Sequence, residues 1–248
     1  MARSTEQTWL LATLTLLFLL PSISLHAQDG EDLEYRMELG GGMGACFYLG
    51  DSNKTPFANL SGMGGLIVRR IFNPRMCVKA NVAMGHIRGN TNGYFLPVDA
   101  DSQTPEGGTP CEVSFSRNVL DVGAQFEMNF WGYGMSGGYK ENSRITPYAL
   151  AGMGFTVGMG GGGSACGALN LPIGVGVKYK MRPRLNIGLE WTMRFSTSDN
   201  LDDTGRTTTL QHPYGIKSVG LKNKDCYSFT MLYVTYDLSP KYRKCNNE

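Results

Sequence analysis

Histidine is the side chain best suited to act as a general base near neutral pH, and this chain has three of them. His26 lies in the N-terminal apolar region, His86 near the predicted end of a strand, and His212 in a long predicted loop. A hydrolytic Ser-His-acid site needs its base within hydrogen-bond reach of a nucleophile. No serine lies in the context of a nucleophile elbow, so the sequence predicts that the protein is not an enzyme.

A glycine-rich stretch, Gly158–Gly163, formally contains the GxGxxG pattern of dinucleotide-binding proteins. That fingerprint requires a preceding strand, a following helix and an acidic residue ~20 positions further on. Here Ser164-Ala165-Cys166-Gly167 follows, with no helix signal and no lysine for a phosphate. We expect a loop at this position and no cofactor.

The six cysteines could bind a metal or form disulfides. Their wide spacing, with no CxxC pair, argues against a zinc site. In an oxidising cell envelope disulfides can form, and two pairs are candidates. Cys46 and Cys226 fall at the end of the first and the start of the last of the β-strands predicted below, which would be neighbours in a closed barrel. Cys111 and Cys166 fall in two of the predicted loops. The alternative is that most of these cysteines are free thiols.

The N-terminus has the features of a secretory signal peptide. Arg3 precedes the apolar run Trp9–Leu20, and Ala27 provides a small residue at the expected cleavage site. We expect residues 1–27 to be the signal peptide and residues 28–248 to form one domain. The chain carries 23 basic and 21 acidic residues without a clustered basic face, which argues against nucleic acid as a partner.

The strands are predicted from strict alternation of apolar and polar side chains. In Leu185–Phe195 every odd position is apolar and every even position is polar or glycine, over the ~9–11 residues that a strand needs to cross a membrane. The other predicted strands are a first one beginning near Glu34, then Gly62–Phe72, Met76–Arg88, Leu120–Phe130, Pro147–Gly158, Ile173–Lys180 and Cys226–Asp237. This pattern predicts an all-β fold, an eight-stranded antiparallel up-and-down transmembrane β-barrel of the outer membrane.

The polar faces of these strands carry acids and bases that would point into the barrel together. They are Glu34, Arg36, Glu38, Asp121, Glu127, Lys178, Lys180, Glu190 and Arg194. The interior of an eight-stranded barrel is just wide enough to be filled by side chains. We therefore expect a plugged, salt-bridged lumen.

The connections between predicted strands alternate in length, as expected if both termini lie in the periplasm. The second and sixth are tight proline turns, whereas the fourth, residues 131–146, is longer than usual for a periplasmic turn. These turns and the basic C-terminal tail form the surface that could meet a periplasmic partner: Asn73, Pro74, Arg75, Arg182, Pro183, Arg184, Lys241, Arg243 and Lys244.

An ordered set of short motifs resembles PorG-like barrels, outer-membrane proteins of the type IX secretion system of Bacteroidota. The motifs are YRMELGGGMG at 35–44, Tyr48–Asp51, Phe72–Arg75, Phe126–Phe130, Thr146–Gly154, and Gly188–Arg194 leading to Asn200–Asp203. The resemblance implies an accessory secretion protein in the outer-membrane lipids, associated with a periplasmic ring of PorK/PorN-like proteins.

Three alternatives remain open at this stage. The first is a small structural or adhesive barrel whose long extracellular loops bind ligands or surfaces. The second is a lipid A-modifying enzyme, which would show a His and Ser cluster at the outer rim. The third is a soluble lipocalin-like barrel, which would keep its apolar faces inward.

Overall fold

The computed structural model describes residues 34–50, 53, 55–90, 114–134, 142–160, 165–197, 201 and 225–241. The predicted signal peptide, Cys111, His212, Arg243 and Lys244 lie outside these residues. In the described part of the chain there is no helix long and apolar enough to cross a membrane.

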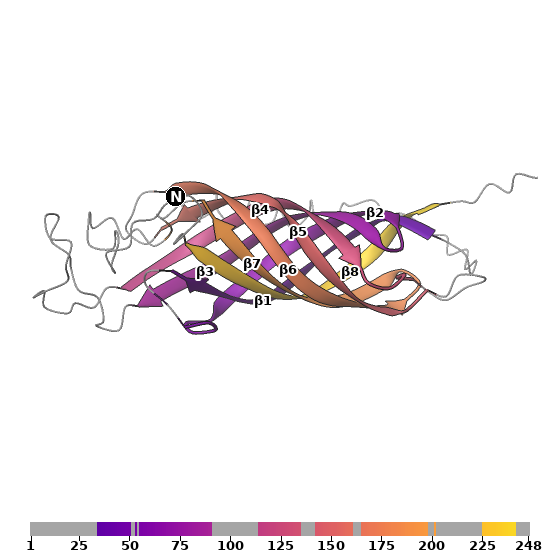
Figure 1. The fold of residues 1–248 in the computed structure, drawn as a ribbon, viewed down its shortest axis with the longest axis horizontal. Helices are drawn as coiled ribbons and strands as arrows, with labels where there is room; N and C mark the ends of the chain where they lie inside the picture. Colours follow the sequence, from indigo (N-terminus) through magenta and orange to yellow (C-terminus); the bar gives the residue numbers. More distant parts are fainter. Residues whose placement is uncertain are drawn as a thin grey trace, which may run out of the picture. The chain divides into compact units, whose positions relative to one another are not determined.

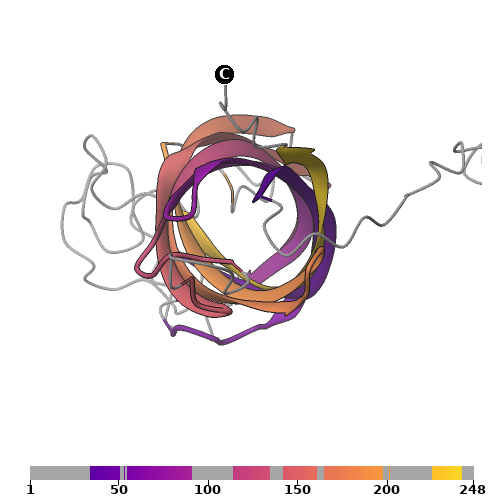
Figure 2. The same cartoon turned by 90° about the vertical axis from the view of Figure 1, so that its right-hand side faces the viewer.

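Eight antiparallel strands form a closed barrel in which each strand pairs with the next and β8 pairs with β1 (Figures 1 and 2). They are β1 (Glu34–Leu49), β2 (Ser61–Asn73), β3 (Met76–Asn90), β4 (Ser114–Asn129), β5 (Ile145–Met159), β6 (Cys166–Arg182), β7 (Leu185–Ser196) and β8 (Cys226–Lys241). The predicted fold class and strand order are thereby confirmed. Because an antiparallel ring has no unpaired edge, every strand can satisfy its backbone groups in lipid.

The structure extends β6 further toward its N-terminus than the sequence predicts. The strand begins at Cys166, whereas alternation predicted a start at Ile173. The ladder between β5 and β6 lacks pairs opposite Pro172, between Ala151↔Ile173 and Gly154↔Asn170. Proline has no backbone N–H to donate to a ladder, so the interruption is local and the strand resumes beyond it.

The outward faces of the strands are apolar. Their exposed large side chains include Met37, Leu39, Met43, Leu66, Val68, Met76, Val82, Met84, Val122, Phe126, Met128, Met153, Phe155, Leu169, Leu171, Ile173, Val175, Val177, Leu189, Trp191, Phe195, Leu232 and Val234. A soluble lipocalin-like barrel would bury its apolar faces, so this distribution excludes that alternative. It is the surface expected of a barrel surrounded by lipid.

Inward-facing glycines allow strands and tyrosine rings to approach closely. A Cβ on Gly44 would lie 1.9 Å from the carbonyl oxygen of Thr230 on β8. A Cβ on Gly176 would meet the ring of Tyr148 at 2.5 Å, and one on Gly188 would meet the Tyr233 hydroxyl at 2.3 Å. The glycines therefore position the β1–β8 seam and the tyrosines that fill the lumen.

The barrel has two different ends. We call the end with the tight β2–β3 and β6–β7 turns, where β1 begins and β8 ends, the turn end. The opposite end, where residues 91–113 and 197–224 connect the strands, is the loop end.

Candidate functional site

The interior of the barrel contains a network of buried acids and bases centred on Glu127 of β4. This carboxylate receives the Nε of Arg69 at 2.9 Å, the Nζ of Lys178 at 3.1 Å and the Nζ of Lys79 at 3.6 Å. All four side chains are at most 2% exposed. Burying a charge is costly unless it is paired, and here one acid faces three bases.

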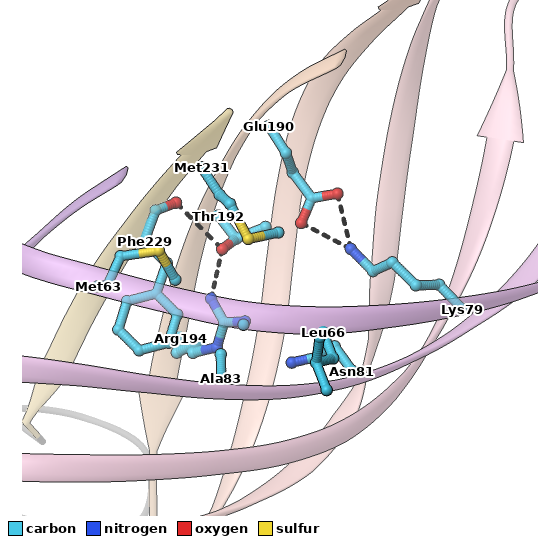
Figure 3. Close-up of a pocket in the computed structure, with 11 residues that line it drawn as sticks. Met63, Leu66, Lys79, Asn81, Ala83, Glu190, Thr192, Arg194, Phe229 and Met231 are labelled. Atoms are coloured by element: carbon cyan, nitrogen blue, oxygen red, sulfur yellow. Dashed lines mark hydrogen bonds and ion pairs between the residues drawn. The ribbon is translucent and has the colours of Figure 1, made fainter. Parts of the chain in front are cut away.

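Glu38 and Glu190 compensate the remaining positive charge. Lys79 contacts Glu190 at 2.6 Å (Figure 3), and Arg69 contacts Glu38 at 3.3 Å. The hydroxyl of Tyr148 also donates to Glu190 at 2.8 Å. The three acids and three bases of this cluster are therefore balanced in charge.

Two further ion pairs lie along the lumen. Arg194 pairs with Asp121 at 3.1 Å, and Lys180 pairs with Asp237 at 2.5 Å. Asn170 donates to Asp121 at 2.7 Å, which occupies another acceptor position of that carboxylate. The lumen is therefore crossed by polar contacts between strands that are distant in the sequence.

The structure brings together seven of the nine charged residues expected in the lumen: Glu38, Asp121, Glu127, Lys178, Lys180, Glu190 and Arg194 are buried and paired. Arg36 lies at the turn end and is exposed, so its predicted place in the network is wrong. The side chain of Glu34 is outside the described residues.

Sequence reasoning missed Arg69, Lys79 and Asp237. Arg69 and Lys79 lie on β2 and β3, which alternate less regularly than most other strands, so no inward face was assigned to them. Asp237 shares its face of β8 with the buried aromatic residues Tyr227, Phe229 and Tyr233, so that face did not show the polar character of an inward one. The available signal was Lys79 between Val78 and Ala80, which is one charged position in an apolar stretch.

Among the described residues the lumen holds little empty space. A cavity of about 10 Å³ lies between Lys79, Glu190, Arg194, Phe229 and neighbouring side chains (Figure 3). A cavity must have a volume of ~10–15 Å³ to hold a single water molecule, so this one is too small for an organic ligand.

Tyr133 fills the lumen at the turn end. Its hydroxyl donates to Asn186 at 2.7 Å, and the Nζ atoms of Lys178 and Lys180 each lie 5.4 Å from its ring centre. Burial first, and then the negative charge of Glu38, raise the pKa of Tyr133 well above its ordinary value, so the hydroxyl stays neutral. Tyr133, at the start of the unusually long β4–β5 connection, therefore packs against lumen side chains at the turn end.

The loop end is closed by an apolar cluster that includes Phe115, Phe229 and Leu201. Leu201 is fully buried, and its backbone N–H donates to Asp225 at 2.9 Å. The Tyr48 hydroxyl donates to the same carboxylate. Both ends of the described barrel are thus filled by side chains.

The described residues among those predicted to meet a periplasmic partner lie at the turn end. Asn73, Arg75, Arg182 and Pro183 are exposed. Pro74 is half-buried, and its carbonyl accepts the backbone N–H of Tyr133 at 3.0 Å. Arg184 donates to the Tyr35 hydroxyl at 3.0 Å and to the Tyr236 hydroxyl at 3.5 Å. The backbone of Lys241 pairs with that of Glu34 at the same end.

The predicted Cys46–Cys226 disulfide is not formed in the structure. Cys46 pairs with Phe229 in the ladder and points into the barrel, whereas Cys226 pairs with Leu49 and points outward. Both are free thiols, and so is Cys166, whose predicted partner lies outside the described residues. The register of β1 on β8 could not be read from the sequence. Cys226 lies three residues along β8 from Phe229, the ladder partner of Cys46, and an odd offset places the two thiols on opposite faces.

The register also brings His86 of β3 within hydrogen-bond distance of Ser116 and Asn118 of β4, on the outward face. Local sequence patterns do not indicate this cluster, because the ladder joins residues about thirty positions apart. Within the described part of the chain no group of three His, Cys, Asp or Glu side chains could hold a metal ion.

A family model described as a domain of unknown function, DUF6089, matches residues 13–247. The chain belongs to the DUF6089 family. Among curated proteins, none matches the sequence.

Solved structures of outer-membrane barrels resemble the fold. Ail, the attachment invasion locus protein of Yersinia pestis, in complex with the heparin analogue sucrose octasulfate, is 15% identical; the match covers 83% of this chain and 99% of Ail, with a TM-score of 0.43. Neisserial surface protein A is 10% identical over 82% of this chain and 97% of its own, with a TM-score of 0.46. OprG of Pseudomonas aeruginosa is 11% identical over 83% and 97%, with a TM-score of 0.42.

Proposed function

We propose that this DUF6089 protein is an outer-membrane component of the type IX protein secretion system, and that its turn end docks a periplasmic ring of PorK/PorN-like proteins. The motif resemblance described above supports the secretion assignment. Docking requires no catalysis and no cofactor.

The exposed apolar belt supports a place in the outer membrane. Outward side chains such as Met153, Leu66 and Leu169 are 70%, 66% and 62% exposed, which would be unfavourable in water for so many neighbours. A closed barrel satisfies its backbone groups and can expose such a belt to lipid.

The observation that carries the docking role is that buried side chains fill the described lumen, while basic side chains are exposed at the turn end. Glu127 and its three cations occupy the interior, and Tyr133 fills the turn end. A filled barrel of this size is not a route for a folded secreted protein. The membrane-held surface at the turn end is what such a barrel can offer to the secretion machinery.

Basic side chains are the features of this surface that an acidic partner would recognise. Arg75 and Arg182 are exposed on two different proline turns, and Arg184 is oriented by its bonds to Tyr35 and Tyr236. Charged groups at an interface contribute mostly to the rate of encounter and to specificity.

Affinity purification of a tagged full-length chain from outer membranes, in mild detergent, tests this proposal. We expect ring-forming lipoproteins to co-purify with the wild-type chain. The double variant Arg75→Glu/Arg182→Glu should lose them, because both turns then repel an acidic partner. Arg88→Glu reverses an exposed charge near the loop end and is the matched control.

Heat-modifiable gel mobility would show that each variant is folded. Undiminished ring capture by the Arg75→Glu/Arg182→Glu barrel would refute docking through the turns. A wild-type chain that purifies alone would contradict the secretion assignment itself and would favour the adhesive alternative.

A further inference from the structure

Three polar side chains on the outward face of β3 and β4 have the arrangement of a nucleophile, a base and an orienting group. The Oγ of Ser116 lies 2.9 Å from Nε2 of His86, and Nδ1 of the same ring lies 2.8 Å from Oδ1 of Asn118. Such a constellation is recognised by geometry and roles, and it recurs on unrelated folds.

The orienting group fixes the protonation of the imidazole. The amide oxygen of Asn118 can only accept a hydrogen bond, so Nδ1 of His86 carries the proton. In the neutral ring Nε2 then has a lone pair, and the Ser116 hydroxyl donates to it. This is the tautomer that a general base needs in order to remove the proton of the serine.

The sheet itself holds the three residues in place. His86 is the ladder partner of Asn118, and Arg88 is the ladder partner of Ser116. Paired side chains on one face of an antiparallel sheet have Cβ atoms about 4.5–5.5 Å apart. The register of two strands therefore fixes the arrangement, and no mobile loop supplies any of its members.

The cluster lies where the apolar belt ends. The outward row of β3 is apolar up to Met84, and His86 is the next outward position. On β4 the row ends at Leu120, followed by Asn118 and Ser116, both exposed. In the orientation proposed above, this level corresponds to the outer leaflet, at the depth where acyl esters join the headgroup.

We propose that Ser116, His86 and Asn118 form a serine-hydrolase site that cleaves carboxylic esters of lipids in the outer leaflet. Ser116 is the nucleophile, His86 the general base and acid, and Asn118 the positioning residue. This activity goes beyond ring docking and lies near the opposite end of the barrel from the turns.

The reaction balances without any added cofactor. The Oγ of Ser116 attacks the ester carbonyl carbon while its proton moves to Nε2 of His86. The tetrahedral intermediate collapses, the ester C–O bond breaks, and the leaving alcohol takes the proton from His86. Water then attacks the acyl-serine by the same route and releases a fatty acid with the serine restored.

Arg88 is the candidate to stabilise the oxyanion that forms in these steps, because it is the ladder partner of Ser116. Its guanidinium has five N–H donors, and in the structure one of them goes to the carbonyl of Leu60 at 2.9 Å. The proposal therefore requires the guanidinium to turn from Leu60 toward Ser116 when substrate binds.

The test uses the full-length chain refolded into phosphatidylcholine vesicles and treated with a fluorophosphonate probe, followed by mass spectrometry of the labelled peptide. We expect label on Ser116 and release of fatty acid. Ser116→Ala should abolish both, and His86→Ala should lower the rate ~10²–10⁴-fold. Ser114→Ala is the matched control, because Ser114 is an exposed outward serine two residues away on the same strand.

The role of Asn118 can be tested by the pH dependence of the rate, which a purely structural residue would not change. Asn118→Asp places a carboxylate against Nδ1 and favours the imidazolium, so the acid limb of the pH–rate profile should shift to higher pH while activity persists. Asn118→Ala should lose most of the activity with the barrel still folded by gel mobility.

A parallel assay with vesicles that contain lipopolysaccharide distinguishes two sources of the ester. Release of fatty acid from either lipid supports the proposal, and the lipid that is cleaved faster is the preferred substrate. Absence of label on Ser116 in folded wild-type barrels, or equal fatty-acid release by the Ser116→Ala variant, would overturn it. Ring capture by the turn end is measured separately, so neither result depends on the other.

Discussion

Replacing Glu127 by glutamine removes the acid that holds the centre of the barrel together. Glu127 is fully buried and faces Arg69 at 2.9 Å, Lys178 at 3.1 Å and Lys79 at 3.6 Å. The amide keeps the volume and one acceptor, but it leaves three bases facing only Glu38 and Glu190. Breaking a buried ion pair by removing one partner costs ~3–5 kcal/mol, and we expect the loss of unfolding free energy to fall in this range.

Equilibrium unfolding in guanidinium chloride, with the barrel in detergent and tryptophan fluorescence as the signal, measures this loss. The control is Arg36→Gln, which also removes a charge but at an exposed position, so its unfolding free energy should change by at most ~0.5 kcal/mol. Adding Lys178→Met to Glu127→Gln should recover part of the loss, because the charge balance is restored. A Glu127→Gln barrel as stable as the Arg36→Gln barrel would refute the reasoning.

Three further predictions concern closure, the turn end and the cysteines. Gly44→Val should prevent refolding in detergent, since its Cβ would lie 1.9 Å from the Thr230 carbonyl oxygen, and a normal heat-modifiable band would contradict this. Tyr133→Phe removes one hydrogen bond and should cost about 1 kcal/mol in the same unfolding assay, whereas an unchanged midpoint would mean that the hydroxyl contributes nothing. A variant that keeps only Cys46 and Cys226 should run identically with and without reductant, and a shift would show that the seam has a different register.

The alternation of side chains was sufficient to predict the fold. Leu185–Phe195 and Leu120–Phe130 show a two-residue period over membrane-spanning length, and the structure contains both strands with the expected apolar faces outward. The inward position of Glu127 and Glu190 follows from the same period. Local pattern determines which face a residue occupies once its strand is known.

What the sequence did not reveal depends on register, which is a long-range property. The pairing of His86 with Asn118, and the offset between Cys46 and Cys226, are set by how far one strand slides past its neighbour. Sliding a strand by two residues leaves every side chain on its face but replaces every partner. For this reason the sequence predicted a disulfide that is absent and missed a Ser-His-Asn cluster that is present.

The most direct test of the docking role is photo-crosslinking in living cells with a benzophenone amino acid at position 75, on the exposed β2–β3 turn, compared with position 88 near the loop end. The proposal predicts a crosslink from position 75 to a periplasmic ring lipoprotein and none from position 88 to that protein. A folded barrel in the outer membrane that gives no such crosslink from position 75, or gives it only from position 88, would contradict the proposal.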